Sequence, residues 1–103
     1  MTTKQILEQS KALIDAGWTR IPHAVNERNQ AVNPQSNEAV AFTINGAIVR
    51  VTKGRLFSVE TKKALELIQK EIGGAIEILS YNNAPDRTKA EVIALLDSVI
   101  TSA

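Results

Sequence analysis

His23 is the only side chain in this sequence that titrates near neutral pH without help from its surroundings. A general base of this kind needs a second polar group that orients the imidazole and shares its proton. Glu27 and Asp86 are possible partners, but the sequence gives no geometry for either, and Pro22 beside His23 indicates a plain turn. We therefore expect His23 to be a histidine of the surface or of a hairpin.

Other groups that could do chemistry are missing or poorly spaced. The chain has no cysteine, which excludes thiolate nucleophiles, disulfide scaffolds and cysteine-bound zinc, and a single histidine excludes a multi-histidine metal site within one chain. No serine lies in a Gly-x-Ser-x-Gly turn, and no glycine-rich phosphate loop is present. Asn82, Asn83 and Asp86 precede a helix, where such residues are usually turn and cap residues. We expect no catalytic residue, no metal and no cofactor, and thus no enzyme.

Charge is separated along the chain although the net charge is only +1. Residues 50–63 carry five basic and one acidic group, whereas residues 64–103 carry three basic and six acidic groups. The basic segment is able to meet phosphates, but the pI of about 8.1 and the single aromatic, Phe57, are weak for a dedicated nucleic-acid binder. A solvated face, or a surface for a second copy or a protein partner, is the favoured interpretation, and weak nucleic-acid binding is the alternative. The residues of this candidate surface are Arg50, Lys53, Arg55, Lys62 and Lys63.

A third hypothesis places a small ligand or a reaction in a cleft. Trp18 and Tyr81 both adjoin predicted helix ends, where an aromatic side chain packs against the core or lines a groove. Core packing is the favoured interpretation. The cleft hypothesis requires five side chains to converge, namely Trp18, His23, Tyr81, Asn82 and Asn83.

Three helices that would position these residues are predicted from apolar spacing and end signals. The first begins after Thr2 or Thr3 and ends at Gly17, and the second begins after Ser58 and ends at Gly73-Gly74. The last follows Pro85 and begins with a capping box of Thr88 and Glu91. Their predicted inner faces are Ile6, Leu7, Leu13 and Ile14 in the first, Val59, Leu65, Ile68 and Ile72 in the second, and Val92, Leu96 and Val99 in the last.

The segments between these helices are harder to assign. Residues 18–25 alternate as in a strand, but Pro22 restricts them to an edge strand or an extended segment, which a turn at residues 26–30 could fold onto Ala31 and Val32. Residues 39–52 fit a hairpin about Asn45-Gly46 slightly better than a helix capped by Ser36 or Asn37. Residues 75–81 fit either a short strand or one or two helical turns.

Three stretches together resemble a small family of uncharacterised bacterial and phage proteins. They are Gly17-Trp18-Thr19, residues 34–48 with Gly46-Ala47-Ile48, and residues 81–92 with Tyr81-Asn82-Asn83. The family pattern has Trp-Cys where this chain has Phe42-Thr43, and Trp-Asn-Asp where it has Tyr81-Asn82-Asn83. The resemblance implies a central helix over the ambiguous 39–52 segment, with Gly46 as a close-packing residue. It implies no activity, and the missing carboxylate at Asn83 argues against acid–base chemistry there.

Together these observations predict an α+β, mostly α, fold: one compact domain over residues 1–103, with about four helices and one short extended or hairpin segment. The start of the sequence has no secretory signal, and no apolar run is long enough for a membrane span, so we expect a cytoplasmic location without membrane contact. The favoured role is a non-enzymatic accessory or protein-interaction module, with possible self-association.

Overall fold

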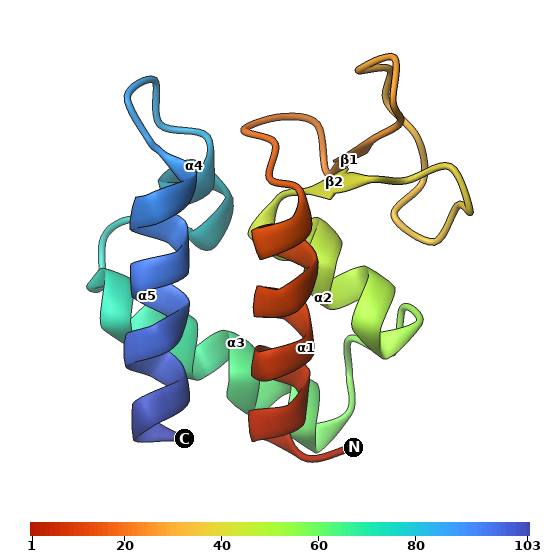
Figure 1. Cartoon of the computed structure of the whole chain (residues 1–103). Helices are drawn as coiled ribbons and strands as arrows, with labels where there is room; N and C mark the ends of the chain where they lie inside the picture. The colour runs from red at the N-terminus through yellow and green to blue at the C-terminus, as the bar shows by residue number, and fades with distance from the viewer.

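Two long antiparallel helices, α1 (Thr3–Ala16) and α5 (Lys89–Ser102), lie side by side in the computed structural model, which describes residues 1–103 (Figure 1). Helix α3 (Val59–Ile72) packs across both of them, and α2 (Ile44–Thr52) packs against α1. The short α4 (Ile78–Asn82) leads into α5, and strands β1 (Ala24–Val25) and β2 (Ala41–Phe42) form a small antiparallel sheet at one end. The α+β, mostly α, prediction is confirmed.

The predicted helix ends are confirmed where side-chain caps define them. Thr2 accepts from the Gln5 backbone while Gln5 reaches back to Thr2, and Thr88 and Glu91 form the same reciprocal box. Ser58 accepts a hydrogen bond from the Thr61 N–H and caps α3. These caps satisfy backbone donors that have no partner inside the helix, so the ends are specified locally.

The hairpin interpretation of residues 39–52 is wrong, because Asn45-Gly46 lies in the first turn of α2. The helix that the family resemblance implied is present, but its cap is Thr43, which accepts from the Gly46 N–H, and not Ser36 or Asn37. Residues 41–42 are still extended because they pair with β1. A Cβ atom on Gly46 would lie 1.9 Å from the His23 carbonyl oxygen, so the helix packs there backbone to backbone. Gly46 is the close-packing residue that the resemblance implied.

Residues 18–40 form the irregular part of the molecule. The peptide bond between Ile21 and Pro22 is cis, and the short strand β1 follows it. The expected fold-back onto Ala31 is present as an isolated bridge to Val25, with the Val32 N–H donating to the Ala24 carbonyl. The main partner of β1, however, is β2 in the register Ala24–Phe42 and Val25–Ala41.

Helix α3 is rotated relative to the predicted face. Its buried residues are Thr61, Ala64 and Ile68, with Leu65 and Ile72 half-buried at the flanks, whereas Val59 is 79% exposed. The predicted inner faces of α1 and α5 are correct apart from Leu13, which is half-buried. The open 75–81 segment resolves as a loop followed by α4, and no helix has the length and apolarity to cross a membrane.

Candidate functional site

Asn82 is the centre of the predicted cleft residues and is completely buried. Its Oδ1 accepts from the Trp18 indole Nε1–H at 3.0 Å and from the Ile44 backbone N–H at 3.1 Å. Its Nδ2 donates to the backbone carbonyls of Thr19 and Arg20 at 3.2 and 3.0 Å. A primary amide has two donor hydrogens and two acceptor lone pairs, so all of its hydrogen-bonding capacity is used within the chain.

These bonds tie three elements together. Asn82 is the last residue of α4, Ile44 is the first residue of α2, and Trp18 to Arg20 follow the end of α1. Arg20 adds a further link by donating from its guanidinium to the Asn83 carbonyl at 2.8 Å. The arrangement gives Asn82 a positioning role in the fold. Sequence spacing contained no sign of this role, because the partners lie 38 to 64 residues away along the chain.

His23 lies near this junction but is exposed, and its Nδ1 is 3.2 Å from the Thr43 hydroxyl. Thr43 is the α2 cap, so the ring contacts a group that is already engaged with the Gly46 N–H. No carboxylate lies within ion-pair distance of the imidazole, and neither Glu27 nor Asp86 contacts it. The Thr43 hydroxyl is thus the side-chain group that the His23 ring contacts.

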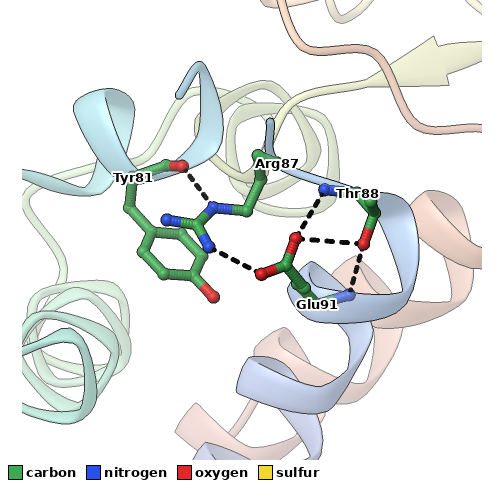
Figure 2. Close-up of polar contacts among 4 residues, drawn as sticks. All are labelled: Tyr81, Arg87, Thr88 and Glu91. Carbon is green, nitrogen blue, oxygen red and sulfur yellow. Dashed lines mark hydrogen bonds and ion pairs between the residues drawn. The ribbon is translucent and has the colours of Figure 1, made fainter. Parts of the chain in front are cut away.

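Tyr81 belongs to a separate contact at the start of α5, shown in Figure 2. The Arg87 guanidinium lies 3.7 Å from the centroid of the Tyr81 ring, and its Nε donates to the Tyr81 carbonyl at 2.9 Å. The same side chain pairs with Glu91 at 3.1 Å. Hydrogen bonds from Thr88 to the Glu91 carboxylate lower the pKa of Glu91, and Arg87 adds to this. Arg87 therefore links Tyr81 of α4 to Glu91 in the N-terminal cap of α5.

The structure thus joins Trp18 and Asn82 by a hydrogen bond, whereas Tyr81 packs on Arg87 and His23 contacts Thr43. The polar atoms of the Trp18 and Asn82 side chains are all bonded within the chain. Four surface depressions are prominent, and none is lined by Trp18, His23, Tyr81, Asn82 or Asn83.

The five basic residues divide into one engaged and four free side chains. Arg50 is half-buried, donates to the carbonyls of Pro34 and Ser36 at 3.1 and 2.7 Å, and lies over the Phe42 ring. It holds the loop before β2. The other four are exposed and have no carboxylate within ion-pair distance: Lys53, Arg55, Lys62 and Lys63.

Exposed apolar side chains lie close in sequence to these four cations. Phe57 is 86% exposed and Val59 is 79% exposed, and Leu56 beside them is also exposed. Sequence reasoning missed this feature because it assigned Val59 to the inner face of α3. The signal was Thr61, whose spacing to Ala64 and Ile68 defines the face that is in fact buried.

A shallow groove of about 610 Å³ runs beside the outward face of α3 and reaches α4. Leu65, Ile78 and Leu79 supply its apolar lining, and Lys62, Glu66 and Glu77 stand at its polar edge. Near its far end Gln69 donates to the Ile76 carbonyl at 2.6 Å. Sequence reasoning did not anticipate the groove, because its two sides come from different helices.

Comparison with known proteins identifies one relationship. No curated protein and no solved structure shows significant similarity to the chain. A family model matches residues 1–102, which agrees with the expected membership in an uncharacterised family and covers the Asn82 junction, the basic segment and the α3 groove alike. The chain belongs to DUF6197, a family of unknown function.

Proposed function

We propose that the protein is a cytoplasmic, non-enzymatic interaction module that docks onto a protein partner through the start of α3. The observation that carries the proposal is the exposure of Phe57 and Val59 among cations that have no partner in the chain. We name this region the α3 docking surface and define it by the following residues: Lys53, Arg55, Phe57, Val59, Lys62 and Lys63.

The exposed side chains of Phe57 and Val59 would release free energy if a partner buried them. Burying a Phe or Val side chain that is exposed yields about 1.5–3 kcal/mol each, so two such neighbours are a substantial anchor. Free cations around an apolar anchor add little affinity, but they steer a partner of opposite charge and select its orientation. A protein surface that combines acidic side chains with an apolar pocket would complement both the cations and the apolar side chains.

Weak nucleic-acid binding through the same cations is the alternative that this proposal competes with. Arg50 is unavailable for phosphate because two loop carbonyls and Phe42 engage it, and Glu60 lies within the remaining basic segment. Phe57 is the only aromatic side chain there that could stack on a base. These features support a protein partner.

A ligand site at Trp18 and Tyr81 has less support, because the polar atoms of Trp18 and Asn82 are occupied within the chain. Asn82 uses all four of its hydrogen-bonding positions within the chain, and Arg87 covers the Tyr81 ring.

Photo-cross-linking in the cells that produce the protein tests the proposal. A photoreactive amino acid at position 57 should give discrete adducts with protein, whereas the same amino acid at Ala94, exposed on α5, should give none. Absence of any protein adduct from position 57 would contradict the proposal. Adducts with nucleic acid, together with binding of purified protein to duplex or single strands that weakens as salt rises, would favour the alternative. Fractionation of the same cells checks the cytoplasmic location.

A further inference from the structure

The outward face of α3 changes its charge along its length. Val59, Lys62 and Glu66 follow one another on one line, since residues three and four apart share a helix face. Around the start of the helix, Lys53, Arg55, Lys62 and Lys63 outnumber Glu60. Further along, Glu66 and Glu77 lie at the edge of the groove, and Lys70 follows Glu66 on the same line. The start of the face is therefore cationic, whereas the edge of the groove carries two carboxylates beside Lys62.

The apolar features of this face are divided in the same way. The cationic end carries protruding side chains, Phe57 and Val59. The groove further along is lined by Leu65, Ile78 and Leu79, beside which Ile76 is 48% and Leu79 is 38% exposed. The groove begins at Lys62, about one turn along α3 from Val59, and its Glu66 and Glu77 carry the charge that attracts the cations at the helix start.

From this we propose that the partner of the α3 docking surface is a second copy of the chain, bound with the two α3 helices antiparallel about a two-fold axis. The proposal rests on the function proposed above and names its partner. In this arrangement Phe57 and Val59 of each copy enter the groove of the other copy, and each Lys62 faces Glu66 of the second copy. The contact is made twice and closes on itself, as two-fold interfaces do.

Antiparallel packing follows from the charge pattern. A parallel pair of α3 helices would place like charges opposite one another and would leave both grooves empty, whereas the antiparallel pair matches cation to carboxylate at both ends. A net charge of +1 per chain gives little overall repulsion between two copies. The contact is confined to α3, the short α4 and the loops beside them, so we expect a weak dimer with a Kd of about 1–100 µM.

Light scattering or sedimentation of the purified chain over a range of concentrations provides the first test. The mass should rise from the monomer value of 11.2 kDa towards twice that value as concentration rises, with weaker association at high salt. Phe57→Ser and Val59→Ser should each weaken association about tenfold or more. These side chains are exposed, so both variants should remain folded.

Charge exchange provides the decisive test. Lys62→Glu places a carboxylate opposite Glu66 of the second copy, and Glu66→Lys places a cation opposite Lys62 of the second copy. Like charges then repel, so each variant alone should be monomeric. An equal mixture of the two variants should dimerise, and the double variant Lys62→Glu/Glu66→Lys should dimerise on its own. Lys4→Glu and Glu8→Lys form a matched control, because Lys4 and Glu8 are exposed on α1 with the same order and spacing.

Three results would overturn the inference: a monomer at every concentration, a dimer indifferent to residues 57, 59, 62 and 66, or a variant mixture that stays monomeric. If the purified chain is monomeric while position 57 still gives adducts with another protein in cells, the proposed function stands and only the identity of the partner fails. If position 57 gives no protein adduct either, both fail.

Discussion

The hydrogen-bonded cluster around Asn82, which we call the Asn82 junction, and the outward face of α3 differ in whether their side chains find partners within the chain. At the junction, every hydrogen-bonding position of the Asn82 side chain is satisfied by the chain itself. On α3, apolar and charged side chains stand in solvent without partners. Chemically suggestive residues can thus be structural, while plain ones such as Phe57 and Lys62 remain available for binding. The two regions should respond differently to mutation.

Gly46→Ala should give the largest loss of stability. The new Cβ would lie 1.9 Å from the His23 carbonyl oxygen, a backbone atom that cannot rotate away. We expect the free energy of unfolding to fall by about 3–4 kcal/mol, at or above the upper end for overpacking, as measured by chemical denaturation. Gly74→Ala, where nothing lies within 4 Å, is the control and should change little. Equal stability of the two variants would contradict the close approach of α2 to the 18–25 segment.

Asn82→Ala should come next, with a loss of about 2–3 kcal/mol. It removes the partner of the Trp18 indole N–H, the Ile44 N–H and two carbonyls, and buried groups left without a partner are costly. The emission of the single tryptophan should shift as well. Asn83→Ala is the matched control, because Asn83 forms its hydrogen bonds through backbone groups that the substitution keeps. If both variants lose the same stability, the junction is not centred on Asn82.

Arg50→Ala should cost about 1–2 kcal/mol, because its guanidinium donates to two loop carbonyls from a half-buried position. Lys53→Ala, a change to an exposed cation of the same segment, should remove no ion pair and should leave packing intact. Thermal unfolding of both variants measures the difference. A larger loss of stability for Lys53→Ala than for Arg50→Ala would contradict the assignment of Arg50 as engaged and Lys53 as free.

The Glu91 cap should produce a small dependence of stability on pH. Hydrogen bonds from Thr88 lower the pKa of this carboxyl in the folded protein, with a further contribution from Arg87. A carboxyl whose pKa is lowered on folding stabilises the protein above its unfolded-state pKa, and this contribution is lost as pH falls through the folded pKa. Glu91→Gln keeps an oxygen for the cap but removes the charge. Wild type should exceed this variant in stability at neutral pH, and the gap should narrow in acid. A gap that widens on acidification would be inconsistent with this assignment.

Phe57→Ser should have the smallest effect on stability, within about 0.5 kcal/mol, because the ring is 86% exposed and packs against little. Chemical denaturation at a dilution where the chain is monomeric separates this from any effect on association. A loss comparable to that of Asn82→Ala would mean that Phe57 belongs to the core, and the contrast between the two regions would disappear.

Local signals in the sequence predicted the parts of the fold that local contacts determine. The capping box at Thr88 and the cap at Ser58 involve residues three apart and are correctly predicted, and of the two caps considered for the first helix, Thr2 is the one observed. The first turn of α2 was ambiguous because Asn45-Gly46 is typical of a hairpin turn. What decides against a turn is the His23 backbone packed on Gly46, a contact between residues distant in sequence.

The candidate sites likewise combine features that are visible in the sequence with features that depend on contacts between distant segments. The charge separation was readable from composition, but the engagement of Arg50 depends on the fold of residues 34–36. The groove joins α3 to α4 and has no signature in either segment alone. Val59 was assigned to the core because a single apolar residue at a helix start is compatible with either face, and only the packing of Thr61, Ala64 and Ile68 sets the rotation.

The most direct test of the difference between the two regions is a dilution series followed by NMR, with backbone and side-chain amide signals recorded from about 1 mM to about 20 µM. We predict that signals of residues 57–66 and 76–79 shift with concentration, while the Trp18 indole N–H and the Asn82 side-chain amide do not move. Constant signals from α3 at all concentrations, or shifts centred on Trp18 and Asn82, would contradict it.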